Sequence, residues 1–271
     1  MNSDEQRIEN IKSAVMRGAF DEAVEPGDPE LSVEEAKALV EKHFLKKGRL
    51  SHKIKTFFAE RGADIVTHIT QKNTEIIDDC FGMPKAAVIT LNHFSPLDST
   101  LVRKYIHQKG CGRLNIVVKD KNFAMKGHIG FLMRYTRTIP LPKEPRQLAS
   151  LFTPEVERVL ESGEYLLIYP EAEMWQNYKK PRPLKDGAYY FAAKYDVPVI
   201  PMFCELLDSE EKLGFRLHVG DAIYPDTRLE RRARAEDMKK RDYEFKISAY
   251  EKAYGKPLDY SFKPDDIACI L

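Results

Sequence analysis

A histidine and an aspartate, separated by four residues, form the pair in this sequence best suited to proton transfer. His93 follows the apolar, β-branched run 88–91, which is typical of a short buried strand. Ser95 and Pro96 then predict a helix start, so Asp98 falls in the first helical turn. Such a turn can bring the Asp98 carboxylate to one imidazole nitrogen of His93. The other nitrogen is then free to act as a general base.

The same residues also fit a purely structural role. Asp98 lies three residues after Ser95, so it can be the acidic member of a capping box. Its negative charge also favours the positive end of a helix dipole. His93 would then be an ordinary turn histidine, and the spacing alone leaves both interpretations open.

The segment N-H-F-S-P-L-D at 92–98 resembles the N-H-x4-D block of the glycerolipid acyltransferases, the 1-acylglycerol-3-phosphate acyltransferase family. Three further blocks follow in the order of that family, at 127–143, 169–173 and 197–202. The resemblance implies that His93 is the general base, that Asp98 orients it, and that Asn92 lies at the substrate site. The sequence contains no G-x-S-x-G nucleophile motif, so we expect direct transfer of the acyl group rather than a covalent acyl-enzyme.

The second and third blocks depart from the family at charged positions. Lys143 stands where the family has an arginine that holds the phosphate of the acceptor, so we expect Lys143 to bind it as a point charge. Arg137 stands where the family usually has glycine. In the third block, Y-P-E-A-E, Glu171 is retained and is expected to position the acceptor or support the turn. Ala172 replaces a glycine there, and Met174 replaces an arginine.

A basic segment follows the third block and offers a replacement for the missing arginine. Its cations are Lys179, Lys180, Arg182 and Lys185. Among the site residues we expect Lys185 to contribute to substrate binding. The alternative is a solvated charged loop, which is the usual meaning of a charge run.

Composition excludes several other classes of function. The 43 Lys and Arg residues nearly balance 42 Asp and Glu residues, which gives no argument for nucleic-acid binding. The 4 cysteines lie far apart and the 7 histidines are scattered, so we expect neither a metal site nor a disulfide framework. The charged start lacks the apolar core of a signal peptide, and no apolar run reaches membrane-spanning length. These features predict a cytoplasmic protein, peripheral at the inner face of the membrane.

The order of elements predicts an α/β fold, with a central, mostly parallel sheet flanked by helices and an N-terminal helical extension. Strands are expected at 86–91, 114–118, 138–141, 165–169, 197–202 and 216–219, with helices between them. The carboxyl ends of these strands should hold the site. We expect a helical extension at 1–80, an α/β acyltransferase core at 81–225 and a C-terminal helical segment packed on it at 226–271. The segment 51–79 is expected to be helical, either packed on the core or docked on a bilayer.

These observations together predict an acyltransferase of phospholipid biosynthesis. The donor would be acyl-CoA or acyl carrier protein as a co-substrate, without a further cofactor, and the acceptor a lysophosphatidic acid-like lipid at the membrane surface. Two alternatives stay open because the usual arginines are replaced. The acceptor can lack a glycerol phosphate, or the chain can be a catalytically weak lipid-binding protein on the same scaffold.

Overall fold

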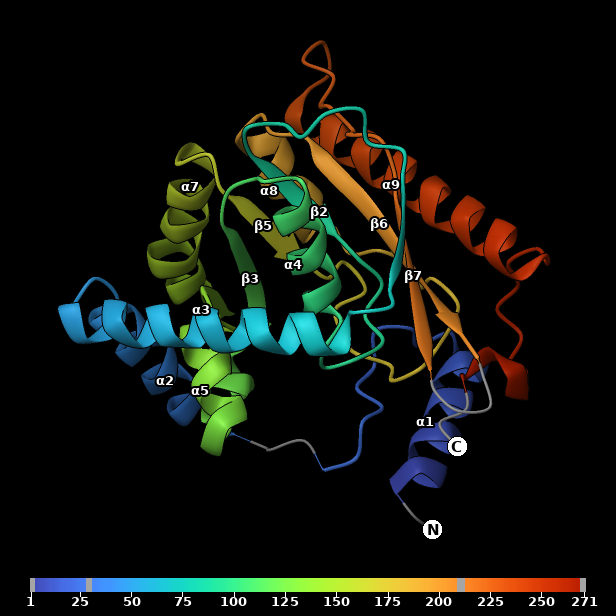
Figure 1. Cartoon of the computed structure of the whole chain (residues 1–271), viewed down its shortest axis with the longest axis horizontal. Coiled ribbons are helices and arrows are strands. Elements are labelled where there is room, and N and C mark those ends of the chain that lie inside the picture. The colour runs from blue at the N-terminus through green and yellow to red at the C-terminus, as the bar shows by residue number, and fades with distance from the viewer. Residues whose placement is uncertain (1–2, 28–30, 209–212, 269–271) are drawn as a thin grey trace.

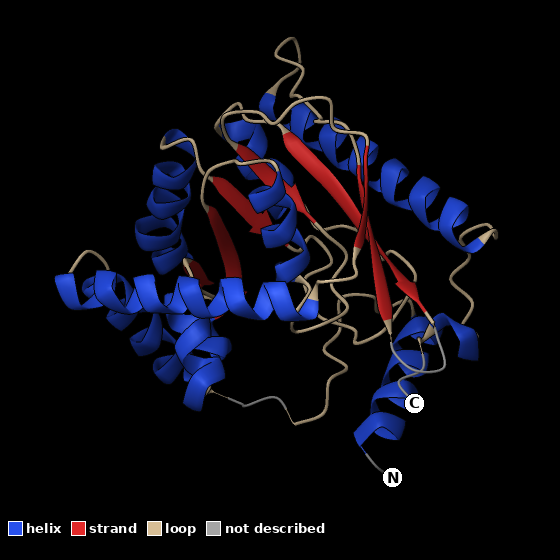
Figure 2. Ribbon diagram, viewed as in Figure 1, coloured by secondary structure: helices blue, strands red, loops and turns tan. Residues whose placement is uncertain are grey.

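A single seven-stranded sheet, with helices on both faces, forms the centre of the computed structural model (Figures 1 and 2). The structure describes residues 3–27, 31–208 and 213–268. The strand order is β1-β7-β6-β2-β5-β3-β4. The strands are β1 (Glu75–Asp78), β2 (Ala87–Thr90), β3 (Leu114–Lys119), β4 (Thr138–Leu141), β5 (Tyr165–Ile168), β6 (Val199–Leu207) and β7 (Gly214–Val219).

Five neighbouring strands, from β6 to β4, run parallel, and β7 then pairs antiparallel with β6. Their carboxyl ends therefore meet at one edge of the sheet, where sites in such folds gather. The predicted fold class, a mostly parallel sheet flanked by helices, is confirmed. Each strand of this parallel group lies within a few residues of its predicted position because each is a short apolar run bounded by turn residues.

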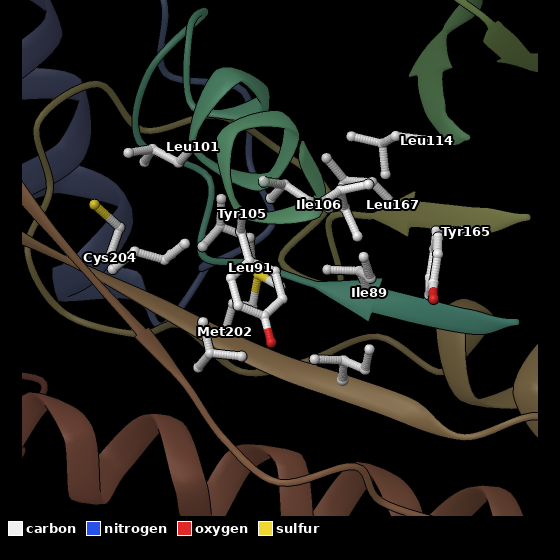
Figure 3. Close-up of a cluster of buried hydrophobic side chains, with 14 of the residues drawn as sticks. Ile89, Leu91, Leu101, Tyr105, Ile106, Leu114, Tyr165, Leu167, Met202 and Cys204 are labelled. Carbon is white, nitrogen blue, oxygen red and sulfur yellow. The ribbon is translucent and has the colours of Figure 1, made fainter. Parts of the chain in front are cut away.

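The sheet is buried on both faces by helices. The longer helices are α1 (Ser3–Arg17), α2 (Val33–Lys46), α3 (Leu50–Thr70), α4 (Ser99–Gln108), α5 (Gly127–Tyr135), α7 (Thr153–Glu161), α8 (Gly187–Lys194) and α9 (Arg231–Tyr254). On one face, Tyr105 and Ile106 of α4 pack over Ile89 and Leu91 (Figure 3). On the other face, α7, α8 and α9 cover the alternate side chains of the same strands, such as Val88. Successive side chains along β2 therefore point to opposite faces of the sheet and pack in two separate hydrophobic cores.

The segment 51–79 is not one helix, and that part of the prediction is wrong. Helix α3 ends at Thr70, and Glu75–Asp78 forms the edge strand β1. This strand pairs with β7, more than a hundred residues later in the chain. A strand of four residues with such a distant partner has almost no local sequence signal. The helical pattern of the preceding residues therefore predicts a helix across it as well.

A buried polar network fastens the C-terminal helix α9 to β2, the strand that leads to His93. Asp242 Oδ2 accepts hydrogen bonds from Thr90 (2.7 Å) and from the hydroxyl of Tyr189 (2.5 Å). Lys246 pairs with Asp242 and donates to Thr90 (2.9 Å). Asp242 and Lys246 are wholly buried, so the pair must remain intact to avoid an uncompensated interior charge.

Candidate active site

His93 and Asp98 meet in the turn between β2 and α4. His93 Nδ1 lies 2.7 Å from Asp98 Oδ2. The helix does not begin at Ser95–Pro96 as predicted, because α4 starts at Ser99 and Asp98 is its N-cap residue. The Asp98 carboxylate lies over the turn and accepts hydrogen bonds from the backbone N–H groups of Phe94 (3.3 Å) and Ser95 (3.4 Å).

The capping-box alternative for Asp98 is present only in part. Asp98 accepts a hydrogen bond from the backbone N–H of Ser95 at 3.4 Å, as the acidic member of a capping box does, but the Ser95 hydroxyl accepts from Leu97 N–H at 3.2 Å and α4 does not begin at Ser95. The Asp98 side chain makes no capping hydrogen bond to α4, and it is 2% exposed. Because Nδ1 is held by Asp98, the lone pair available for chemistry belongs to Nε2, provided that Nδ1 carries the proton. Nε2 has no hydrogen-bond partner among the described residues, and His93 lines a pocket. This is the geometry that a general base requires.

Tyr169, at the end of β5, completes the pair, and sequence analysis missed it. Its ring stacks on His93 with centroids 3.9 Å apart, and its hydroxyl donates to Asp98 Oδ1 at 2.6 Å. Burial, followed by the negative charge of Asp98, raises the pKa of Tyr169 well above its usual value. Tyr169 therefore stays protonated and acts as a fixed donor. The one signal in the sequence was its place as the first residue of the third block.

Replacing Tyr169 with phenylalanine should lower kcat by about tenfold while KM changes little. The variant loses one charge-assisted hydrogen bond to Asp98, so Asp98 should hold the His93 ring less firmly. The matched control is Tyr165→Phe, which removes a hydroxyl bonded to the Pro84 carbonyl at the other end of β5. Steady-state kinetics of both variants check the prediction. Equal losses in the two variants would contradict a specific role for Tyr169.

Glu171 supports the catalytic turn from below and does not line the pocket. Its Oε2 accepts the backbone N–H of His93 at 3.1 Å, and its carboxylate pairs with Arg182 at 2.8 Å. Arg182 also donates to Phe20 O (2.9 Å) and lies over the Trp175 ring. Both charged side chains are buried. Of the two roles expected for Glu171, the structure favours support of the turn.

Three of the four cations in the basic segment form ion pairs within the protein. For these three the expected role, replacement of the missing arginine, is wrong. Lys179 pairs with Asp208 (2.5 Å), Lys180 pairs with Asp266 (2.7 Å), and Arg182 pairs with Glu171. All three cations are buried. Lys185 alone lines the pocket, with Asp21 at 2.5 Å as its partner.

Asn92 and Lys143 are not brought to the site as expected. The Asn92 amide bonds the backbone of Cys204 at both ends, accepting at 2.7 Å and donating at 3.1 Å. Asn92 therefore ties the turn to β6, and it is 1% exposed and does not line the pocket. Lys143 is exposed beyond β4 and is not among the residues that line the pocket. The prediction for Lys143 depended on its position in the second block. In the structure Lys143 follows the end of β4 and lies outside the pocket.

The pocket beside His93 has a volume of about 370 Å³. Its walls are largely apolar and come from β3, β5 and α5, including Ile116, Val118, Ile129, Met133 and Ile168. Lys119, Lys121 and Lys185 also line it. Lys119 forms an ion pair with Glu173. A narrow apolar space joined to cationic groups fits a molecule with a hydrocarbon chain and an anionic group.

The chain before α2 also contributes to this pocket, which no motif indicated. Ala23, Val24 and Glu25 line it. The segment is held by the Trp175 indole, which donates to Glu22 O at 2.9 Å, and by Gln176 N–H, which donates to Glu25 at 2.9 Å. Residues near 20–25 therefore complete a wall formed mainly by residues a hundred positions later.

Ala172 and Arg137, which replace family glycines, both have left-handed backbones. Their φ values are 68° and 54°. Glycine adopts such angles without steric cost, which gives the physical reason for glycine at these positions. Both turns keep the glycine-type conformation after the replacement.

Two kinds of feature are not found in the part of the chain that the structure describes. No group of three or more His, Cys, Asp or Glu side chains is placed to hold a metal ion there. Among the helices of residues 3–27, 31–208 and 213–268, none combines the length and apolarity needed to cross a membrane.

Comparison with known proteins identifies one family. The family model described as Acyltransferase matches residues 68–205. The chain is also similar to the crystal structure of the 1-acyl-sn-glycerophosphate (LPA) acyltransferase PlsC from Thermotoga maritima, with a TM-score of 0.46 and 15% sequence identity. That similarity covers 89% of this chain and 98% of the other. No curated protein sequence matches significantly.

Proposed function

Because the chain belongs to the acyltransferase family, whose model covers residues 68–205, we propose that it acylates a lysophosphatidic acid-like acceptor in phospholipid biosynthesis. The donor would be a thioester, either acyl-CoA or acyl-acyl carrier protein. One observation carries the proposal. The Asp98 carboxylate holds Nδ1 of His93 at 2.7 Å, while the ring lines a pocket with apolar walls.

In the proposed mechanism His93 Nε2 takes the proton from the acceptor hydroxyl as its oxygen attacks the thioester carbonyl. Asp98 stabilises the imidazolium that forms. Collapse of the tetrahedral intermediate forms the ester and breaks the C–S bond, and the imidazolium returns the proton to the thiolate. The backbone N–H groups of Phe94, Ser95 and Leu97 are already engaged, so they are poorly placed to stabilise the oxyanion.

Lysines in the pocket support an acceptor that carries a phosphate. Lys119, Lys121 and Lys185 line the same space as His93. They offer point charges without the bidentate geometry of arginine. We propose that these lysines, rather than Lys143, hold the acceptor phosphate, and that the apolar wall from β3 and α5 holds an acyl chain.

Exposed apolar side chains on α3 support binding at a membrane surface. They are Leu50, Ile54, Phe57, Phe58, Ile65 and Ile69. Each is at least 49% exposed, and Ile54 has the lowest value. Such a stripe is unusual on a soluble monomer and is typical of helices that lie in a bilayer interface. We propose that the chain is a peripheral protein of the cytoplasmic face and that α3 docks there.

The deciding experiment offers acyl-CoA and acyl-acyl carrier protein to the purified protein with three acceptors of equal chain length. These are lysophosphatidic acid, lysophosphatidylcholine and monoacylglycerol. Transfer that requires the phosphomonoester supports the proposal. Faster transfer to monoacylglycerol would show that the acceptor need not carry a phosphate. Absence of transfer with every pair would favour the lipid-binding alternative.

Replacing Lys119 or Lys185 with glutamine should raise the KM for lysophosphatidic acid by about tenfold, because each removes a charge-assisted contact. The KM for the acyl donor should change little. Lys143→Ala is the comparison, since this lysine lies outside the pocket. A larger increase in acceptor KM for Lys143→Ala would return the phosphate site to that residue.

A further inference from the structure

A second cavity, of about 710 Å³, lies at the amino ends of β3 and β4. Its lining residues come mainly from α2, α3 and α5 and from residues that precede two strands. Figure 1 shows where these three helices lie. Arg113 immediately precedes β3, and Arg137 immediately precedes β4. This cavity therefore opens at the amino ends of the strands, whereas His93 lies at their carboxyl ends. Thr138 is the residue that lines both spaces.

The side chains that line the cavity include more cations than carboxylates. Among its lining residues, the carboxylates are Glu60 and Asp64. The cations are Lys47, Lys53, Arg61, Arg113, Arg134, Arg137 and Arg158. Much of this charge is balanced by carboxylates outside the lining. Glu155 pairs with Lys47 at 2.6 Å and with Arg158 at 2.6 Å, and Glu164 lies 3.4 Å from Arg113 and 4.0 Å from Arg137. Lys53 and Arg61 have no ion pair among the described residues.

A buried polar atom in this cavity also lacks a partner. His43 lines the cavity and is 8% exposed, and its Nε2 makes no hydrogen bond within the described structure. Burial, reinforced by the positive charges of Lys47 and His52, lowers the pKa of His43 to about 3. The imidazole is therefore neutral at pH 7. Unsatisfied buried polar atoms are rare and costly, so the wall of this cavity contains a polar group that the described structure leaves without a partner.

Arg137 provides a further indication that the cavity is built to present charge. Its backbone has φ 54°, a conformation that glycine adopts at much lower cost. The side chain lies 3.4 Å from Glu60 and contributes to the cavity wall. Such strain is often found at binding sites. The arginine therefore adds a cation to the cavity at a position where the backbone favours glycine.

We propose that this cavity binds the phosphate of an anionic phospholipid headgroup, at a site separate from the catalytic pocket. The rim of the cavity favours a lipid over a free phosphate. Phe57 lines the cavity, is 56% exposed and belongs to the exposed apolar stripe of α3. Lys53 and Arg61 lie one helical turn to either side of it. A headgroup in the cavity would therefore leave its acyl chains along the apolar stripe.

Vesicle binding by a charge-matched pair of variants tests this site. The cavity variant is Lys53→Gln with Arg61→Gln, and both side chains are exposed, so folding should be retained. The control is Lys46→Gln with Lys72→Gln, which removes the same charge from exposed positions outside the cavity. Affinity for phosphatidylcholine vesicles containing phosphatidylglycerol should fall about tenfold or more in the cavity variant. Equal losses in both variants would show non-specific attraction and overturn the proposal.

Two further measurements separate the source of the phosphate from the catalytic site. In the first measurement, inorganic phosphate or sn-glycerol 3-phosphate is added without vesicles, at concentrations of phosphate where vesicles bind. The midpoint of thermal unfolding should then stay unchanged in both the cavity variant and the unaltered protein. A selective shift of the unaltered protein would assign the cavity to a free phosphate and overturn the lipid source. Acyl transfer in detergent solution should be the same in both variants. A loss confined to the cavity variant there would contradict a separate site.

Discussion

Alanine at position 93 should reduce kcat for acyl transfer by about a hundredfold to ten-thousandfold, which is the usual contribution of a general base. The expected loss is large because His93 lines the pocket and its Nε2 is the proposed base. The other ring nitrogen, Nδ1, lies 2.7 Å from the Asp98 carboxylate. The KM values should change much less, since the imidazole acts mainly in the transition state. Transfer to lysophosphatidic acid, with circular dichroism to verify the fold, is the measurement.

Two companion variants make this result specific to the pair. Asp98→Asn keeps the shape of the side chain but removes the charge that stabilises the imidazolium, so kcat should again fall steeply. His128→Ala is the control, because His128 is exposed on α5 and does not line the pocket. Unchanged kcat in His93→Ala would remove the histidine from the mechanism, whatever the acceptor.

Glutamine in place of Arg182 should lower the free energy of unfolding by about 3–5 kcal/mol, because it leaves a buried carboxylate without its partner. Glu171 and Arg182 are 2% and 1% exposed and lie 2.8 Å apart. The Glu171 carboxylate also accepts the His93 N–H, so the variant should lose activity even at temperatures where it remains folded. Urea unfolding and kinetics at low temperature measure the two effects.

The exposed pair of Arg228 and Asp226 provides the control for this prediction. Arg228 is 87% exposed on its side chain, and Arg228→Gln should leave the unfolding midpoint nearly unchanged, since solvent screens the pair. The double variant Arg182→Met with Glu171→Leu should recover part of the lost stability, because it removes both buried charges together. It should not recover activity. A stable, fully active Arg182→Gln protein would contradict the proposed support of the turn.

Local sequence was enough to predict the fold class, the strands of the parallel group and the family. Each of these depends on short-range pattern, such as the apolar run before His93 or the block at 92–98. Strand β1 was missed because four residues, Glu75–Asp78, become a strand only by pairing with β7. The predicted helix start at Ser95 was wrong because Asp98 bonds the turn itself rather than the helix.

The sequence by itself determined which residue types can perform the chemistry and that His93 and Asp98 lie close enough to meet. Only the tertiary structure decided which charged residues reach the pocket. Arg182, Lys179 and Lys180 are buried, and each is paired with a carboxylate that lies 11 or more positions away in the chain. Lys119 and Lys185 converge on the pocket from separate parts of the chain. A charge run has the same appearance in sequence whether it is solvated, buried or at a site. Its fate depends on the long-range partners that folding brings to it.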